Sequence, residues 1–540
     1  MTSVNSSTSV MPVLPPLADR RVTDLLARRA AGQADETFIV LPHERETWTF
    51  GSLWESATRL ATGLRSLGLG PGDKCAIILP NSSEYLLTWF ASMIVGSVDA
   101  AVSGGLHGAL LAHQLRIASV KIAICDEVTR EWVREIAHEL SDLETVVVVG
   151  QARARQTRPR EVPFSTLFQE PPLDPYASDP AQPVSIRYTS GTTGPAKAVA
   201  MTHSRVTTAA VQYAWITEYV STDRLYTCFP LQHGLASFYG VVATLVAGGS
   251  VVIDRRFSAR EFWTRIRQYD ATMAHIVNPL VGILLRQEHK LDDRTHRCSR
   301  LWTAVPNPAF EERFGARLIN FYGQSEGNVI AYMPPGEQAP NGSAGRPSPL
   351  FDIQVCDEHD YPVPPGERGQ ILWRPREPHL VTPGYAGDPV ATVNAWQNLW
   401  FHTGDEGYFD EAGFLYLVGR MGDQIRRRGV NIAAADIEAV ALRFGGIQEA
   451  AAFAVPSDLG ESEAVLAVVP TDGVGFTVEG LARYLREQLP REMVPRYLEV
   501  RSSFPVTSTY KVPKAELRSR WLGGLVPSGA IDIAIEGAGR

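Results

Sequence analysis

The chain has few cysteines, and they lie far apart. Its 540 residues include Cys75, Cys125, Cys228, Cys298 and Cys356, and no two of them form a CxxC pair. Metal knuckles and disulfide frameworks need closely spaced cysteines, so this spacing argues against both. Scattered single cysteines fit a reducing cytosol, and we expect a cytoplasmic protein.

An excess of basic charge is also missing. The chain holds 51 lysines and arginines against 59 acidic residues, a formal net charge of −8. Nucleic-acid-binding proteins present a strongly basic face, so we expect no nucleic-acid partner. The 44% share of hydrophobic residues is that of a globular protein, and a length of 540 residues predicts two or more domains.

One uncharged stretch, Leu235 to Ile253, has nearly the length of a membrane span. Gly240, Gly248 and Gly249 interrupt it, and Ser250–Ile253 has the composition of a buried strand. We therefore expect a core helix followed by a strand, and no membrane span. Residues 1–17 are rich in Ser, Thr, Val and Pro without a basic start, which predicts a disordered tail rather than a signal peptide.

Short apolar segments alternate with helical patterns from Val22 to about Arg187. This alternation predicts an α/β fold with a large N-terminal body of mainly parallel sheets. Short strands and turns over 342–416 predict a small β-rich subdomain, and the pattern after it predicts an α+β lid. The expected parts are a tail (1–17), an N-terminal domain (18–418), a hinge (419–423), a mobile C-terminal lid (424–520) and a second tail (521–540).

A segment dense in hydroxyls and glycines follows the strand predicted over 184–188. It contains Thr189, Ser190, Gly191, Thr192, Thr193, Gly194 and Lys197. Glycines let backbone N–H groups face an anion, hydroxyls add donors and the lysine adds a positive charge. The segment therefore predicts a phosphate-binding loop, with a ligand-free Thr/Ser-rich turn as the alternative. A Walker loop is disfavoured, because only two residues separate Gly191 and Gly194 and Ala198 follows the lysine.

Other motifs follow this loop in a fixed order. They are Pro230-Leu231-Gln232-His233, Tyr322-Gly323-Gln324-Ser325-Glu326, His402-Thr403-Gly404-Asp405, Gly419-Arg420 with Asp423, and Thr507–Lys511. Together they resemble the adenylate-forming superfamily of acyl-CoA synthetases, luciferases and adenylation domains, from about Val22 to Arg518. Phe257–Trp263 and Phe310–Gly315 are most similar to carnitine/crotonobetaine-type and medium-chain acid–CoA ligases.

The resemblance implies an AMP-forming ligase that uses ATP and Mg²⁺. Its first step would join a carboxylate to the α-phosphorus of ATP and expel pyrophosphate, so positive charge is needed where two anions meet. In this family pattern the loop residues hold the β and γ phosphates, and Tyr322, Gly323, Gln324 and Ser325 face adenine and the α-phosphate. Glu326 would carry Mg²⁺, Asp405 with Arg420 would bind the ribose, and Lys511 would bridge carboxylate and α-phosphate.

Several of these residues keep simpler explanations. Asp405 could belong to an ordinary turn, and Glu326 could be an acid favoured at the start of a helix. Lys514 competes with Lys511 for the catalytic role. His233 resembles a gate over the acid pocket, and both a contact with the acid and a structural role stay open for it.

Departures from the family pattern concentrate around the hinge and the thiol side. Gly422 stands where a charged hinge residue is usual, and Val430 and Ala434 replace a common Glu and Pro. Coenzyme A is the expected acceptor, and Arg426, Arg427 and Arg428 could meet its phosphates or form a solvated face. An amine or carrier protein remains an alternative acceptor, including nitrite activation for diazotisation of an amine, and an inactive nucleotide-binding regulator is a third class. The substrate would be a small-molecule acid or oxyanion whose size the sequence does not indicate, and a homodimer is also considered.

Overall fold

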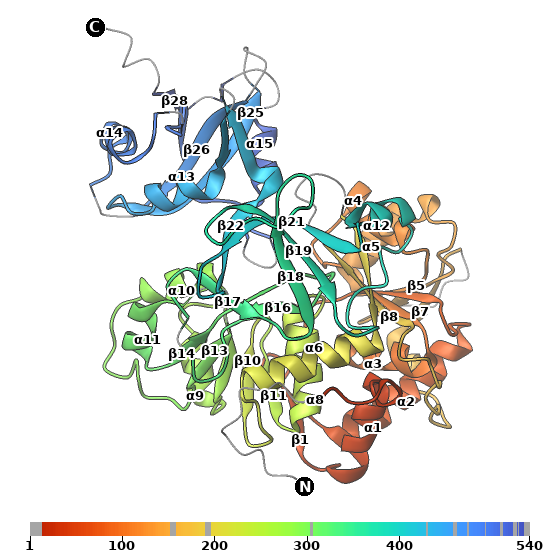
Figure 1. Cartoon of the computed structure of the whole chain (residues 1–540). Helices are drawn as coiled ribbons and strands as arrows, with labels where there is room; N and C mark the ends of the chain where they lie inside the picture. Colours follow the sequence, from red (N-terminus) through yellow and green to blue (C-terminus); the bar gives the residue numbers. More distant parts are fainter. Residues whose placement is uncertain are drawn as a thin grey trace, which may run out of the picture. The chain divides into compact units, whose positions relative to one another are not determined.

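The computed structural model describes residues 13–151, 158–189, 196–302, 306–337, 339–427, 430–456, 462–471, 475–491, 493–507, 511–521, 526–527 and 529–533, with the backbone alone at 422, 424, 426, 430 and 431. These residues form two compact units (Figure 1). The first takes its described residues from Met1–Ser190, Ala196–Asp352 and Arg374–Gln397. The second takes them from Ile353–Trp373 and Asn398–Arg540.

The first sheet of the first unit carries the predicted phosphate loop. Its strands lie in the order β7 (Arg160–Pro163), β6 (Thr145–Val148), β5 (Val120–Cys125), β3 (Lys74–Ile78), β4 (Val98–Ala101), β8 (Pro183–Tyr188) and β9 (Ala198–Thr202). All neighbours are parallel except the last pair. The helices α2 (Phe50–Ser66), α3 (Ser83–Val95), α4 (Gly108–Ile117) and α5 (Glu127–Ile136) connect its strands.

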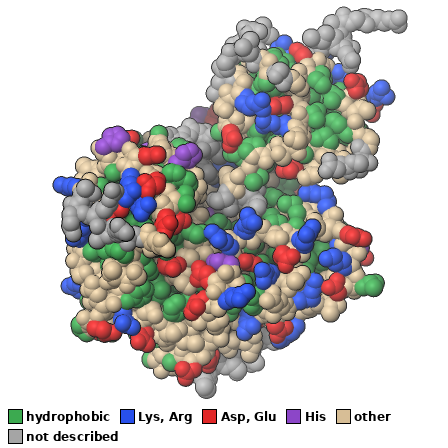
Figure 2. Space-filling model, turned by 180° about the vertical axis from the view of Figure 1, so that it is seen from behind, with side chains coloured by type: hydrophobic (Ala, Val, Ile, Leu, Met, Phe, Trp, Pro, Cys, Tyr) green, Lys and Arg blue, Asp and Glu red, His purple; other side chains and the backbone are tan. Residues whose placement is uncertain are grey.

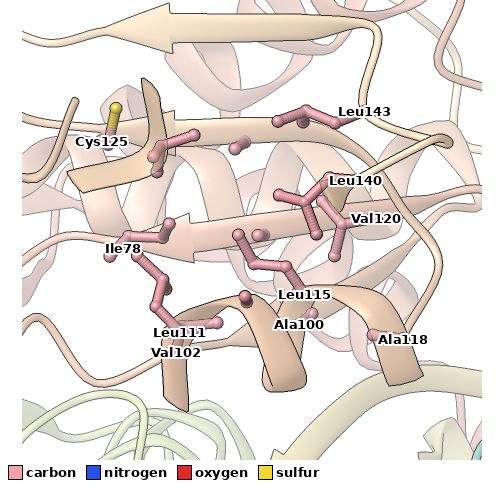
Figure 3. Packing of buried hydrophobic residues seen from close by; sticks show 14 of the residues in the cluster. Ile78, Ala100, Val102, Leu111, Leu115, Ala118, Val120, Cys125, Leu140 and Leu143 are labelled. Atoms are coloured by element: carbon pink, nitrogen blue, oxygen red, sulfur yellow. The ribbon is translucent and has the colours of Figure 1, made fainter. Parts of the chain in front are cut away.

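Local sequence explains where these helices begin and end. Thr49 and Ser52 form a capping box that starts α2. Ser82 accepts a hydrogen bond from the Tyr85 amide at the start of α3, and Gly96, with φ of 83°, ends that helix. Apolar side chains of the strands pack against α4, which contributes Leu111 and Leu115 to the same cluster (Figure 3).

A second parallel sheet completes the core of the first unit. Its order is β14 (Arg317–Ile319), β13 (Arg300–Trp302), β12 (Met273–His275), β10 (Arg224–Thr227), β11 (Ser250–Ile253), β1 (Thr37–Leu41) and β2 (Glu46–Thr49), with only β2 antiparallel. Its helices are α1 (Val22–Gly32), α6 (His203–Ile216), α7 (Gly234–Ala236), the π-helix Ser237–Val242, α8 (Ala243–Ala247), α9 (Phe262–Gln268), α10 (Asn278–Leu285) and α11 (Pro308–Phe314). The predicted α/β fold with mainly parallel sheets is confirmed.

Two local features differ from the simplest interpretation of the sequence. The apolar run 318–322 is not one strand, because β14 ends at Ile319 and β15 (Phe321–Gly323) pairs in a different sheet, with β16 (Val329–Tyr332). Buried Asn320 lies between them and donates its side-chain N–H to the carbonyl of Ser343. The uncharged stretch from Leu235 is not one regular helix, because α7, a π-helix and α8 share it.

The remaining strands are mostly antiparallel. In the first unit β16 also pairs with β17 (Ser343–Pro347), and α12 (Pro389–Ala395) lies further along the chain. β20 (Trp396–Gln397) also belongs to the first unit. The second unit contains β21 (Trp400–Phe409), β22 (Leu415–Arg420) and most of β18 (Phe351–Cys356) and β19 (Gly369–Pro375), the two strands divided by the unit boundary. The hairpin β23 (Gln424–Arg427) and β24 (Val430–Ala433) follows.

A four-stranded sheet ends the second unit. Its order is β25 (Ile447–Pro456), β26 (Ser462–Pro470), β27 (Tyr497–Val500) and β28 (Ala530–Asp532), with helices α13 (Ala434–Ala441), α14 (Val478–Gln488) and α15 (Lys514–Ser519). Apolar residues cover both faces of this sheet, among them Leu466 and Leu485 on one side and Phe453 and Trp521 on the other. The predicted α+β C-terminal part is therefore present.

All five cysteines are buried and unpaired. Burial raises the pKa of Cys356 to about 11 and the pKa values of Cys75, Cys125 and Cys298 to about 12. The thiolate is the reactive form of cysteine, so these side chains are poor nucleophiles at neutral pH.

Charged side chains of both signs are interspersed on the face that Figure 2 shows. Some form exposed ion pairs, such as Arg116 with Glu139 and Arg297 with Asp270, each at 2.5 Å. Exposed pairs of this kind add little to stability. Among the residues that the structure describes, no helix has the length and apolar character to cross a membrane.

Candidate functional site

The predicted phosphate loop is the connection of a β-hairpin. Tyr188 at the end of β8 pairs with Ala198 at the start of β9, and the Thr189 amide donates to the Lys197 carbonyl over 3.0 Å. Ser190, Gly191, Thr192, Thr193 and Gly194 lie outside the described residues. The two ends of the loop are therefore fixed side by side, with Thr189 and Lys197 facing each other.

One tyrosine connects this hairpin to the predicted metal carboxylate. The Lys197 ammonium lies 4.7 Å from the centre of the Tyr385 ring. The hydroxyl of the same Tyr385 donates to Oε1 of Glu326 over 2.9 Å. Lys197 therefore contacts the ring and Glu326 contacts the hydroxyl of the same buried tyrosine, although the two residues are far apart in sequence.

Tyr385 is held in place by the backbone on either side of it. The Ala200 amide donates to the Gly384 carbonyl (3.1 Å), and the Ala386 amide donates to the Ala198 carbonyl (2.7 Å). The segment around Tyr385 therefore continues the ladder at β9. The sequence analysis missed this residue, because only the pairing with β9 indicates that it belongs to the site.

The segment after β15 positions Ser325 and Glu326 through their backbone carbonyls. Arg205 Nη2 donates to the Ser325 carbonyl over 2.5 Å, and the Thr382 amide donates to the Glu326 carbonyl over 2.9 Å. No helix starts here, so the interpretation of Glu326 as a helix-start acid is wrong. A Cβ on Gly323 would lie 2.5 Å from the Asn328 carbonyl oxygen, which explains a glycine in this motif.

The residues near Glu326 fit a magnesium ion that is bound together with a phosphate substrate. Among the described residues, no group of three His, Cys, Asp or Glu could hold a metal by itself. Mg²⁺ usually binds one or two carboxylates plus substrate phosphates and keeps several waters. A half-buried single carboxylate whose Oε1 is oriented by a hydroxyl agrees with that mode of binding.

Asp405 and Arg420 form a cross-strand pair in the second unit. They face each other in the register of β21 and β22, with 2.8 Å between Arg420 Nε and Asp405 Oδ1. Arg420 Nη1 also donates to the Thr403 carbonyl (2.9 Å). Asp405 therefore lies within a strand, and the alternative of an ordinary turn residue is wrong. Gly404 before it has a φ of 68°, a conformation that favours glycine.

Lys511 lies near this pair. Burial of its ammonium group and the positive charge of Arg420 lower the pKa of Lys511 below 10.5, while Asp405 acts in the opposite direction. The residue as a whole remains exposed, and its carbonyl accepts a hydrogen bond from the Thr507 amide (2.9 Å). Residues of three separate motifs thus meet in one unit.

The competing lysine, Lys514, has a structural environment. Its ammonium lies 2.7 Å from Glu438 Oε1 and 3.8 Å from Asp423 Oδ2. These carboxylates balance its charge and join α15 to α13.

One of the three arginines expected on the thiol side also has a structural environment. Arg427 is buried and paired with Glu463 at 2.7 Å, so it does not belong to a solvated basic face. Arg428 and Gly429 lie outside the described residues.

The predicted gate, His233, lies directly before α7. It is exposed, and its Nδ1 accepts a hydrogen bond from the Leu235 amide over 3.3 Å. A different histidine, His275, is fully buried and bonded to Tyr213 through Nε2 (2.9 Å). Burial lowers the pKa of His275 to about 3, so it is neutral at physiological pH.

A packed aromatic cluster lies beside the motif that contains Ser325. Trp302 stacks on Phe321 with ring centres 4.1 Å apart, and Tyr239 of the π-helix lies 6.1 Å from Trp302 and 6.5 Å from Phe321. These rings fill the space next to β15. π-helical segments occur frequently at functional sites.

Comparison with known families agrees with this geometry. Residues 26–386 match the family model described as AMP-binding enzyme, and residues 436–511 match the AMP-binding enzyme C-terminal domain. The chain belongs to the AMP-binding enzyme family. The predicted adenylate-forming, AMP-forming ligase is confirmed, and acid–CoA ligases of this family use ATP, Mg²⁺ and coenzyme A.

Relatives within the family are acid–CoA ligases. A crotonobetaine/carnitine–CoA ligase of Salmonella arizonae is 29% identical over 88% of this chain and 94% of its own length, and one of Escherichia coli is 27% identical over 87% and 93%. Among solved structures, the anthranilate–CoA ligase AuaEII with anthranoyl-AMP has a TM-score of 0.84 at 21% identity, covering 94% of this chain and 98% of its own. ATP-bound MatB from Rhodopseudomonas palustris has a TM-score of 0.83 at 22% identity, covering 92% and 99%. The structural likenesses support the fold.

The position of Tyr385 leads to a test of its hydroxyl. Tyr385→Phe keeps the ring under Lys197 but removes the hydrogen bond to Glu326. We therefore expect the Mg²⁺ concentration for half-maximal pyrophosphate exchange to rise by at least about 10-fold, the effect of one hydrogen bond to a charged group. The matched control is Tyr188→Phe, whose hydroxyl donates only to the Gln114 carbonyl among the described contacts. An unchanged Mg²⁺ requirement in Tyr385→Phe would show that this bond does not orient Glu326.

Proposed function

We propose that this enzyme joins a small carboxylic acid to AMP at the residues described above and then transfers the acyl group to coenzyme A. The observation that carries the proposal is the grouping of Lys511, Asp405 and Arg420 in one unit. An ammonium next to a ribose-binding carboxylate would lie where the α-phosphate of ATP meets the acid. The most anionic point of the transition state is then the point of greatest positive charge.

The phosphate side of the reaction is assigned to the first unit. Thr189 and Lys197, with Ser190, Gly191, Thr192, Thr193 and Gly194, would hold the β and γ phosphates. Glu326 would hold Mg²⁺ against them, which neutralises the pyrophosphate as it leaves. Ser325 would donate to the α-phosphate, and Tyr322, Gly323 and Gln324 would form the wall beside adenine.

The acid would bind near the aromatic cluster, with His233 at its entrance. Exposed His233 precedes the π-helix, and Tyr239 of that helix packs against Trp302 and Phe321. The position of His233 just before the helix that contacts the cluster supports its role as a gate for the acid.

Coenzyme A is the acceptor that the named relatives favour. We assign thioester formation to a lid of residues 424–520 that turns about residues 419–423 after adenylation, with the N-terminal domain at 18–418. The unpaired cysteines favour a reducing, cytoplasmic location. Light scattering measures whether the enzyme is a monomer or a homodimer.

The experiment that tests this function has two stages. The purified enzyme is first given ATP, Mg²⁺, labelled pyrophosphate and single acids, and acid-dependent exchange of label into ATP is expected. Coenzyme A is then added, and the thioester is sought by mass spectrometry. Exchange without a thioester would reject coenzyme A as acceptor. Parallel reactions with amines as acceptors, and with nitrite as the activated anion, would then identify the alternative. A lack of exchange with every acid and with nitrite would reject the function.

A further inference from the structure

Two buried arginines lie against one phenylalanine in the first unit. Arg187 is in strand β8 just before the phosphate loop, at 4% exposure, and Arg205 is in the first turn of α6, at 3% exposure. Their guanidinium carbons lie 4.8 Å and 5.9 Å from the centre of the Phe238 ring. Phe238 belongs to the π-helix that follows His233.

The charges of this cluster do not cancel. Arg187 Nη1 lies 2.5 Å from Oδ2 of Asp99, a fully buried carboxylate. Arg205 donates to the Ser325 carbonyl, and no ion pair of Arg205 occurs among the described residues. One buried positive charge is therefore left without a partner carboxylate in contact. A buried charge is costly unless it is paired and hydrogen-bonded.

The same two arginines leave hydrogen-bond donors unused. Nε and Nη2 of Arg187 and Nε and Nη1 of Arg205 are buried, and among the described residues none of the four has an acceptor. Buried polar groups are nearly always hydrogen-bonded, so an unsatisfied group in a native protein indicates a missing water, ion or ligand group. Glu326 acts on the charge of Arg205 without forming an ion pair with it. Four unused donors with no further carboxylate in contact therefore indicate an anion.

Phe238 covers the position where that anion would bind. A ring over a guanidinium gives only a cation–π contact, whereas a carboxylate gives paired, charge-assisted hydrogen bonds to the planar fork of an arginine. Displacing the ring by a carboxylate therefore exchanges a weaker interaction for a stronger one and gives the unused donors their acceptor.

The surroundings restrict the size of the ligand. Arg205 is bonded to Ser325, which the proposed function places at the α-phosphate, so the activated carboxylate would lie nearby. Tyr239, whose charge when ionised would act on Arg205, belongs to the packed aromatic cluster with Trp302 and Phe321. The packed rings of this cluster favour a short chain next to the cationic site.

We propose that Arg205, together with Arg187, binds a second carboxylate of the acid, so that the substrate is a short dicarboxylic acid. This rests on the proposed function: one carboxylate is activated by ATP, and the other is held by the arginines. Arg205 is then a specificity-determining residue, and Phe238 closes the site when it is empty.

Comparison of matched acids with the unaltered enzyme tests the substrate class. Succinate is compared with succinamate, and malonate with malonamate, pairs of similar length in which one carboxylate is replaced by a neutral amide. We expect kcat/KM for acid-dependent exchange to be at least about 100-fold higher for the diacid, because a site built for a charged group rejects a neutral analogue. An equal or higher value for the amides, or for butyrate, would overturn the proposal.

Substitutions of Arg205 test whether this residue binds the second carboxylate. Arg205→Met is expected to raise KM for the diacid by about 100-fold, as loss of one partner of a buried charge pair does, while KM for ATP stays nearly constant. Arg205→Lys keeps the positive charge but lacks the planar fork of the guanidinium group. Its KM for the diacid should therefore lie between those of the unaltered enzyme and Arg205→Met. Arg29→Met is the matched control, because Arg29 also donates to backbone carbonyls, those of Leu245 and Val246.

The outcomes separate the possible roles of Arg205. A structural role through the Ser325 carbonyl would change KM for ATP, the diacid and the amide together, and this result would overturn the proposal. If Arg205→Met does not fold, Arg205→Lys and the matched acids still test whether Arg205 binds the second carboxylate. Exchange with monoacids alone would reject the dicarboxylate and keep the proposed function, whereas no exchange with any acid would reject the proposed function itself.

Discussion

Replacing Lys511 by alanine is expected to lower acid-dependent pyrophosphate exchange by about 10²–10³-fold, the usual effect of removing one group that stabilises transition-state charge. Binding of ATP should change little, because the assigned contacts of the phosphates, the magnesium ion and the ribose lie on other residues. The two measurements are the exchange rate and the dissociation constant of ATP by isothermal titration. Together they distinguish loss of chemistry from loss of binding.

Lys514→Ala is the control for Lys511→Ala. Lys514 is three residues further along and is neutralised by Glu438 and Asp423. Its removal leaves half-buried Glu438 without its cation, so the thermal midpoint should fall while exchange changes by a few-fold at most. Equal losses of exchange in the two variants would contradict the assignment of Lys511, and full exchange in Lys511→Ala would reject it.

Loss of Asp99 should cause the largest change in stability. Its carboxylate accepts hydrogen bonds from Trp89 Nε1 (3.0 Å), Ser185 Oγ (3.1 Å) and Arg187 Nη1 (2.5 Å). Asp99→Ala removes all three acceptor contacts and leaves a buried arginine without a counter-charge, at a cost of about 3–5 kcal/mol. We expect the midpoint of thermal unfolding to fall by roughly 10 °C, measured by calorimetry.

Glu139→Ala is the matched control for Asp99→Ala. Glu139 also pairs with an arginine at 2.5 Å, but both side chains are solvent-exposed. Its loss should therefore change the midpoint very little. Similar midpoints for the two variants would mean that burial does not set the strength of the Asp99–Arg187 pair.

The sequence predicted the fold because its signals are local. Alternation of apolar segments with helical patterns depends on neighbouring residues, and the capping of α2 and α3 by Thr49 and Ser82 can be recognised in the same way. The division of the apolar run around Asn320 between two sheets could not be predicted, since it depends on which strands are available as partners. Local patterns predict elements well and their partners poorly.

The residues of the candidate site also fall into two groups, those that stand in a sequence motif and those that only the folded structure identifies. Glu326, Asp405 and Lys511 stand in motifs of fixed spacing, so the sequence alone indicated them. Tyr385 and Arg205 have no such motif. Tyr385 meets Glu326 across 59 residues, and Arg205 meets Ser325 across 120, contacts that are created only when the chain folds.

The burial of all five cysteines has a practical consequence for studies of this enzyme. Thiol reagents attack thiolates that they can reach, and these side chains are enclosed and have raised pKa values. A single cysteine introduced on the surface of residues 424–520 would then carry a spectroscopic label without removal of the native ones. In the same way, colorimetric titration of thiols during turnover would report the consumption of coenzyme A against a low background from the protein.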